Sequence, residues 1–195
     1  MDLAEFRRRL ARAPAPAASV YGDDGAAERQ AAGVTPAAVL VPVVDHPVGP
    51  TVLFTRRTAQ LKKHSGQISF PGGRAEASDP SVEFTALRET QEEIGLPPDK
   101  VEVIARLPEY FTRTGFRVTP VVGVIQPPLE LVPDAREVDE VFEVPLAFLL
   151  DAANHRRASR EIGGRTAHYY EIEHNGRVIW GATAGMIVNL YRMLA

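Results

Sequence analysis

The sequence contains no cysteine, and this absence excludes two kinds of site. Neither a disulfide framework nor a zinc site built from thiolates can form without it. Long apolar runs are also missing: none approaches the roughly 20 residues that a membrane-spanning helix needs, and no signal-peptide core is present. We therefore expect a cytoplasmic protein that does not enter a membrane.

The chain also lacks an excess of charge of one sign, because 22 basic residues stand against 25 acidic ones. The resulting net charge of −3 argues against general binding to nucleic acid or to a membrane surface. A length of 195 residues suits one domain with a substantial core. We expect a small molecule as partner, and the sequence leaves a monomer and a homodimer both open.

The first 33 residues differ in pattern from the rest of the chain. Residues 6–10 suggest a short amphipathic surface helix, and residues 13–33 are rich in alanine, proline and glycine without apolar periodicity. We interpret residues 1–33 as a helix followed by a connecting arm. Residues 34–195 alternate strand-like apolar runs with helical patterns, which predicts one mixed α/β domain.

Short-range signals place the elements of this domain. Asp79 and Pro80 are expected to open its first helix and Gly95 to close it. The dipeptide Asn175-Gly176 is typical of a tight hairpin turn. The expected strands are residues 34–44, 51–55, 101–107, 117–125, 137–144, 168–173 and 177–180, and the expected helices are 78–94, 145–151 and 183–194.

One expected helix gathers three carboxylates onto a narrow stripe. At about 100° per residue, Glu89, Glu92 and Glu93 share one face of the helix. Neighbouring carboxylates on such a face lie roughly 6 Å apart and repel by about 3 kcal/mol per pair at an effective dielectric of 20. A divalent cation would relieve this repulsion, so the stripe predicts a metal site. The residues expected to face the core, on the other side, are Phe84, Leu87 and Ile94.

The stripe and the glycine loop before it resemble the Nudix box, the signature of hydrolases of nucleoside diphosphates linked to another moiety. The interval from Gly73 to Arg88 is one residue longer than in that pattern, G-x5-E-x7-R-E-U-x-E-E-x-G-U, where U is bulky and apolar. Pro80 occupies the place of the early glutamate, with Asp79 the nearest acid, and Thr90 replaces an apolar residue. The matching residues are Gly73, Arg88, Glu89, Glu92, Glu93, Gly95 and Leu96.

The resemblance implies a Nudix fold, an α/β/α sandwich around a mixed β-sheet, and a site for Mg²⁺ or Mn²⁺. It implies that Glu89, Glu92 and Glu93 are metal ligands, joined by the carbonyl of Gly72. Arg88 would orient a ligand carboxylate through a bidentate pair. The competing interpretation, an acidic and solvated helix face, is disfavoured by the adjacent glycine loop.

The general base is less well specified. A glutamate outside the box often serves in this superfamily, and Glu140 is our candidate for that role or for a further metal ligand. Glu93 or His64 could serve instead, since a neutral imidazole suits proton transfer near neutral pH.

A second motif runs directly into the box and narrows the substrate. Its pattern, L-L-T-x-R-[SA]-x3-R-x3-G-x3-F-P-G-G, marks the coenzyme A pyrophosphatase branch of the Nudix hydrolases, and residues 53–73 resemble it. Lys62 stands where the pattern has arginine, which keeps the charge but loses the planar fork. The matching residues are Leu53, Thr55, Arg57, Gly66, Phe70, Pro71, Gly72 and Gly73.

This second resemblance implies cleavage of the diphosphate of coenzyme A, or of its thioesters, to 3′,5′-ADP and 4′-phosphopantetheine. We expect Arg57, Lys62 and Lys63 to bind phosphates. Hydrolysis of ADP-ribose or of a dinucleotide is the nearest alternative, and a non-catalytic Nudix domain that binds a nucleotide is another. The aromatic residues considered for stacking on adenine are Tyr110, Phe111 and Tyr169.

Overall fold

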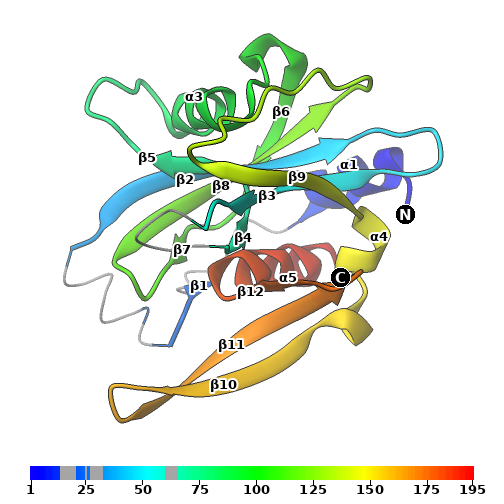
Figure 1. Ribbon diagram of the computed structural model, residues 1–195. Helices are drawn as coiled ribbons and strands as arrows, with labels where there is room; N and C mark the ends of the chain where they lie inside the picture. The colour runs from blue at the N-terminus through cyan, green and yellow to red at the C-terminus, as the bar shows by residue number, and fades with distance from the viewer. Residues whose placement is uncertain (14–20, 25, 27–32, 60–65) are drawn as a thin grey trace.

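The computed structural model describes residues 1–13, 21–24, 26, 33–59 and 66–195, and its centre is a nine-stranded mixed sheet (Figure 1). The middle of the sheet is a parallel pair, β2 (Thr35–Val44) and β8 (Phe116–Ile125), matched over the whole length of both strands. The other strands are β1 (Tyr21–Gly22), β3 (Thr51–Arg57), β4 (Ile68–Ser69), β5 (Gly72–Arg74), β6 (Val101–Arg106), β7 (Tyr110–Phe111) and β9 (Val138–Pro145).

The strand order is β1-β7-β8-β2-β3-β4, with β5 also paired to β2, β6 to β8 and β9 to β3. Most residues of β2 and β8 are buried, and both strands are rich in valine. Such continuous apolar strands are typical of a sheet that is covered on both faces.

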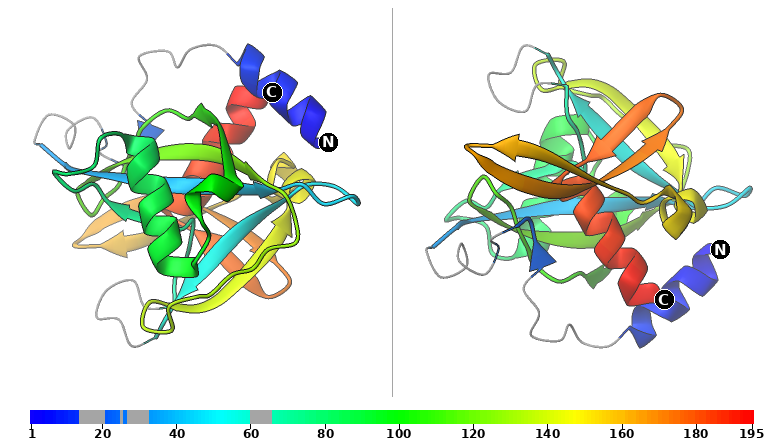
Figure 2. Two further views of the ribbon diagram at one scale, coloured as in Figure 1. Left: turned by 90° about the horizontal axis from the view of Figure 1, so that it is seen from above. Right: turned by 90° about the horizontal axis from the view of Figure 1, so that it is seen from below.

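Helices cover both faces of this sheet, which confirms the expected α/β/α sandwich (Figure 2). Helix α3 (Val82–Ile94) packs on one face, over a hydrophobic cluster that includes Leu40 and Leu53. Helix α5 (Ala182–Leu194) lies on the other face, over a larger cluster that includes Phe54 and Ile187. Two 3₁₀ turns, η1 (Pro98–Lys100) and η2 (Ala152–Asn154), and the short helix α4 (Leu146–Leu149) complete the connections. In the described ranges no helix is both long enough and apolar enough to cross a membrane.

A separate three-stranded sheet lies on the α5 side and consists of β10 (Arg156–Ile162), β11 (Arg165–His174) and β12 (Arg177–Trp180). The hairpin between β11 and β12 is confirmed, since Asn175 and Gly176 have φ angles of 50° and 75°. Strand β10 was not predicted. Its sequence is mainly polar and charged, as suits an exposed strand at the sheet edge.

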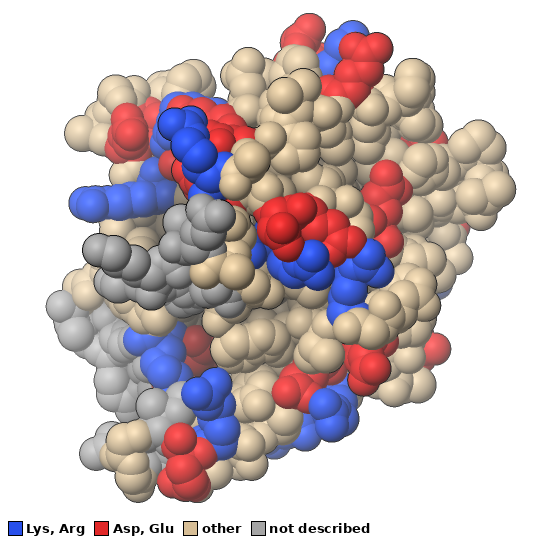
Figure 3. Space-filling view, in the orientation of Figure 1, with Lys and Arg blue, Asp and Glu red and all other residues tan. Residues whose placement is uncertain are grey.

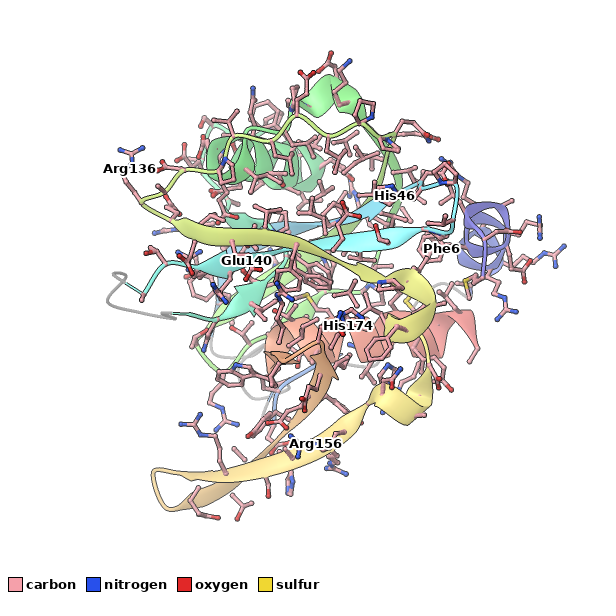
Figure 4. All side chains as sticks on the ribbon, turned by 45° about the vertical axis from the view of Figure 1, so that its right-hand side comes forward. Phe6, His46, Arg136, Glu140, Arg156 and His174 are labelled. Atoms are coloured by element: carbon pink, nitrogen blue, oxygen red, sulfur yellow. The ribbon has the colours of Figure 1, made fainter. Side chains whose placement is uncertain are left out.

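Helix α1 (Leu3–Arg12) confirms the amphipathic helix expected near the N-terminus, and it is fixed to the domain. Its Phe6 is completely buried in the larger hydrophobic cluster. Arg7 forms a bidentate ion pair with Glu102 of β6, at 2.6 and 2.7 Å. Figure 4 shows Phe6 at the inner side of α1.

The first turn of α3 differs from the prediction. The helix begins at Val82, and its N-cap is Ser81, whose Oγ accepts a hydrogen bond from the Phe84 amide at 3.2 Å. Asp79 does not cap the helix, because its carboxylate is bound by Arg88 and Thr85. Gly95 ends the helix in the left-handed conformation with φ 70°, as expected.

The buried face of α3 also differs in part from the prediction. Phe84 is 47% exposed and contributes little to the core, whereas Leu87 and Ile94 pack against the cluster under α3. The small residues Ala86 and Thr90 are fully buried instead, which allows the helix to lie close to the sheet. The buried stripe therefore adjoins the glutamates rather than lying opposite them.

Candidate active site

Two glycines place the loop before α3 against both the sheet and the helix. An added Cβ at Gly72, whose φ is 149°, would lie 2.4 Å from the carbonyl oxygen of Ala38 on β2. An added Cβ at Gly73 would lie 2.3 Å from Oε2 of Glu89 on α3. Gly72 thus leaves no room for a side chain, and a side chain at Gly73 would displace the Glu89 carboxylate, because the loop backbone lies directly against it.

Glu93 is the most buried of the three predicted metal ligands, with 5% of its side chain exposed. Its Oε2 accepts a hydrogen bond from the Gly72 amide at 3.3 Å, and its Oε1 lies 3.4 Å from Nη1 of Arg57. Burial raises the pKa of Glu93 to about 7, although the Arg57 charge and the Gly72 amide act in the opposite direction. Glu93 is therefore a desolvated carboxyl group next to a cation and to the glycine loop.

Glu89 and Glu137 lie close enough to Glu93 for their charges to interact. Burial raises the pKa of Glu89, and the charges of neighbouring acids, including Glu137, raise it further. The charges of Glu137 and Glu89 also raise the pKa of Glu93. Glu137 contacts the same arginine as Glu93, since its Oε2 is 3.8 Å from Nη2 of Arg57. Two acids of α3 and one from the turn before β9 thus share one region.

Arg88 has a different partner from the one expected. Its Nε and Nη2 donate to the two carboxylate oxygens of Asp79 at 3.1 and 3.0 Å, so the bidentate pair is with Asp79. Its Nη1 lies 3.0 Å from Glu89 and 3.2 Å from Glu92. Hydrogen bonds from Arg88 hold the pKa of Asp79 at about 2. Asp79 thus anchors Arg88, which in turn positions Glu89.

Glu92 differs from the other two glutamates, because 59% of its side chain is exposed and its carboxylate reaches back to Arg88. Over the described part of the chain, no group of three acidic or histidine side chains is already arranged to hold a metal ion. The stripe is therefore split, with Glu89 and Glu93 turned inward and Glu92 turned outward.

The inward part of the stripe fits a divalent cation. Burial raises the pKa of both Glu89 and Glu93, and the charges of neighbouring acids raise both values further: those of Glu92 and Glu137 act on Glu89, and those of Glu137 and Glu89 act on Glu93. A cation bound between such carboxylates would offset both effects. Oxygen donors of this kind suit Mg²⁺ and Mn²⁺.

Glu140, the sequence candidate for the general base, lies away from this region. It faces Arg56 across β3 and β9, and it pairs with Arg56 at 3.0 Å and with Arg177. Figure 4 shows it on the side of β9 away from α3. The Arg177 hydrogen bond lowers the pKa of Glu140. A bulge between Arg56 and Arg57 changes the register, and Glu137 is the acid of this segment that lies beside Arg57.

Arg57, one of the expected phosphate ligands, lies at the border between Glu93 and a cavity of about 400 Å³. Gly72 and Phe70 also line this cavity, which extends to the three-stranded sheet and to the start of α5. Lys62, Lys63 and His64 lie outside the described residues. Basic and acidic side chains are interspersed on the face in Figure 3, in keeping with the small net charge.

Only one of the three aromatic candidates lines the cavity. Tyr110 and Phe111 are 5% and 4% exposed and belong to the interior. Tyr169 lines the cavity together with Trp180, and the two rings meet edge to face with centroids 5.8 Å apart. Trp180 is not among the predicted aromatic residues, because no local pattern indicates that the end of β12 reaches this cavity.

The comparisons with known proteins identify the family of the chain. The model of the NUDIX domain family matches residues 34–163. A Pectobacterium atrosepticum protein with the name "Uncharacterized Nudix hydrolase NudL" is 43% identical over 154 residues, which cover 79% of this chain and 80% of that protein. The solved structure of a Nudix hydrolase from M. smegmatis, RenU, has a TM-score of 0.50 and 29% identity, over 59% of this chain and 73% of that one.

A Nudix hydrolase from Alicyclobacillus acidocaldarius has a TM-score of 0.51 at 23% identity, over 60% of this chain and 81% of that one, and this likeness concerns the fold alone. The family match and the identity to the Pectobacterium protein carry the assignment. This chain belongs to the Nudix family of pyrophosphohydrolases.

Proposed function

We propose that the protein hydrolyses the diphosphate of coenzyme A, and also of coenzyme A thioesters, with Mg²⁺ or Mn²⁺ as cofactor. The observation that carries this proposal is the position of Arg57. This residue belongs to the motif that resembles the coenzyme A branch, and it contacts Glu93 of the Nudix box at 3.4 Å while lining the adjacent cavity. A volume of about 400 Å³ falls in the range of sites for small ligands.

The roles follow from this arrangement. Glu89 and Glu93, which turn inward, would hold the cation, and the resemblance to the Nudix box adds Glu92 and the Gly72 carbonyl as further ligands. A bound Mg²⁺ or Mn²⁺ would supply a water of lowered pKa and would neutralise charge on the phosphates. Arg57 would bind a diphosphate oxygen from the cavity side.

The hydrolytic step adds one water across the P–O–P bond. The water oxygen forms a bond to one phosphorus, the bridging oxygen leaves with the other phosphate, and the proton of the water passes to a carboxylate. We propose Glu137 for this role in place of Glu140, because Glu137 shares Arg57 with Glu93. The products are 3′,5′-ADP and 4′-phosphopantetheine.

Mass analysis of the products tests the proposal most directly. We expect purified protein with Mg²⁺ or Mn²⁺ to convert coenzyme A to these two products, and to lose all turnover in EDTA. The kcat/KM for coenzyme A should exceed that for ADP-ribose by about tenfold or more. A preference for ADP-ribose or for a dinucleotide would overturn the choice of substrate, and binding without any product would overturn the activity.

Replacing Arg57 by glutamine should lower kcat/KM for coenzyme A by about 10- to 100-fold, because a charge-assisted contact to phosphate is lost. The neighbouring Arg56 provides a matched control, since its side chain pairs with Asp139 and Glu140 on the other face of the strand. Arg56→Gln should leave kcat/KM within about twofold. Steady-state kinetics of both variants would contradict the assignment of Arg57 if the two substitutions had equal effects.

A further inference from the structure

Two arginines line the part of the cavity formed by the β7–β8 loop and the three-stranded sheet. Arg113 lies in the loop between β7 and β8, and Arg160 lies on β10. Neither guanidinium forms an ion pair with any acid in the described part of the chain, whereas Arg57 is paired with Glu93 and Glu137. The cavity therefore contains two guanidinium groups that no acidic side chain of the described residues neutralises.

The strand register fixes which side chains of the three-stranded sheet face the cavity. Arg160 is opposite Ala167 on β11, and both residues line the cavity. Tyr169, two residues further along β11, lies on the same face as Ala167. Trp180 of β12 pairs with Glu171, which is two residues beyond Tyr169 on β11, so Trp180 lies on this same face. Its ring contacts the Tyr169 ring. One face of the sheet thus presents a cation and a pair of aromatic rings to the cavity.

The loop that carries Arg113 is held in place by Asp23. The Arg113 amide donates to Oδ2 of Asp23 at 2.6 Å, and the Tyr110 hydroxyl donates to Oδ1 at 2.8 Å. Asp23 is the only acidic residue among the described residues that line the cavity, beside the three arginines Arg57, Arg113 and Arg160. The cavity as a whole therefore favours a ligand with more than one anionic group.

We propose that Arg113 and Arg160 bind the 3′-phosphate of coenzyme A, with its adenine against the rings of Tyr169 and Trp180. This inference rests on the proposed function and identifies the residues that recognise the nucleotide half of the substrate. A phosphate monoester offers several oxygens to a pair of guanidinium groups, which bind it through directional, charge-assisted hydrogen bonds. Arg57 then remains for the diphosphate. These residues would discriminate coenzyme A from its 3′-dephospho form and from ADP-ribose, which lack this group.

The kinetic test compares coenzyme A with 3′-dephospho-coenzyme A for the native protein and for Arg113→Gln and Arg160→Gln. Each substitution should lower kcat/KM for coenzyme A by about tenfold or more and leave that for the dephospho form within about twofold. Arg157→Gln is the matched control, because Arg157 lies on the same strand but lines a different cavity, of about 240 Å³. An equal loss on both substrates, or no loss on either, would overturn the proposal.

A binding test without turnover separates this inference from the proposed function. Titration calorimetry with 3′,5′-ADP and 5′-AMP compares two ligands that differ only in the 3′-phosphate. The native protein should bind 3′,5′-ADP at least about tenfold more tightly, and both glutamine variants should lose this difference. If coenzyme A is hydrolysed but the two ligands bind equally, the 3′-phosphate site is wrong while the proposed function stands. If the difference is present but coenzyme A is not hydrolysed, the proposed function fails and the phosphate site remains.

Discussion

Replacing Glu93 by glutamine should reduce the kcat for coenzyme A hydrolysis by roughly 10³-fold or more, equivalent to about 4 kcal/mol of transition-state stabilisation. Glu93 is 5% exposed and lies between the Gly72 amide and the Arg57 guanidinium. A neutral amide would neither hold the cation nor balance the charge of Arg57. Initial rates at saturating Mg²⁺ and Mn²⁺ provide the measurement.

Glu83→Gln is the control for this prediction, because Glu83 lies on the same helix and pairs with Arg106 outside the site. It should retain activity within about twofold. A fully active Glu93→Gln variant would contradict the role of Glu93 as a ligand.

The stability of the metal-free protein gives an independent check on the same variant. The pKa of Glu93 is raised from 4.5 to about 7, so ionisation of this group opposes folding, and the penalty grows as the pH rises from 4.5 to 7. Above pH 7 the metal-free Glu93→Gln variant should therefore be more stable than the native protein, by on the order of 3 kcal/mol at most. The two should be equally stable near pH 4. Chemical denaturation in the presence of EDTA at several pH values measures this difference. Adding Mg²⁺ instead should stabilise the native protein more than the Glu93→Gln variant.

The parts of the fold that were predicted correctly depend on strong local signals. Gly95, with Pro97 and Pro98 shortly after it, ends α3 as expected. Asn175-Gly176 has the backbone freedom that a two-residue hairpin turn needs. Strand β10 was missed although the sequence holds a second signal of this kind, Gly163-Gly164, which forms the two-residue turn to β11 with φ angles of 58° and 75°. Its partner is β11 alone, and its side chains are mostly exposed, so it has no apolar pattern.

The sequence predicted which helix residues form the candidate site, but it predicted their orientation only in part. A helical projection places Glu89, Glu92 and Glu93 on one stripe, but it does not show where the sheet lies. The small buried residues Ala86 and Thr90 determine that orientation. Because they face the sheet, Glu93 turns inward and Glu92 turns toward solvent.

The positions of the site residues outside the Nudix box depend on strand register and on chain topology. The bulge after Arg56 places Glu137, and not Glu140, beside Arg57, and a bulge of this kind has no clear mark in the sequence. Arg113 and Arg160 are 47 positions apart and belong to different elements. Only the packing of the three-stranded sheet against the central one brings them to the same cavity.

Replacing Gly73 by alanine should reduce kcat/KM by about 100-fold or more and increase the Mg²⁺ concentration needed for half-maximal activity, with little loss of stability. The new Cβ would lie 2.3 Å from Oε2 and 2.5 Å from Cδ of Glu89. These atoms form the end of a flexible side chain, so the carboxylate can move away and the protein can fold. Metal titrations of activity and thermal unfolding provide the two measurements.

Gly72→Ala should behave in the opposite way, and the contrast tests the explanation. At Gly72 the added Cβ would lie 2.4 Å from the Ala38 carbonyl oxygen and 2.5 Å from the Cα of Val39, with φ at 149°. Backbone atoms of a central strand cannot move aside as a glutamate can, so this variant should lose stability first. A double-mutant cycle completes the test. If Gly73→Ala acts by displacing the Glu89 carboxylate, the Gly73→Ala/Glu89→Gln protein should be no less active than Glu89→Gln alone. Additive losses would show that the glycine acts through another contact.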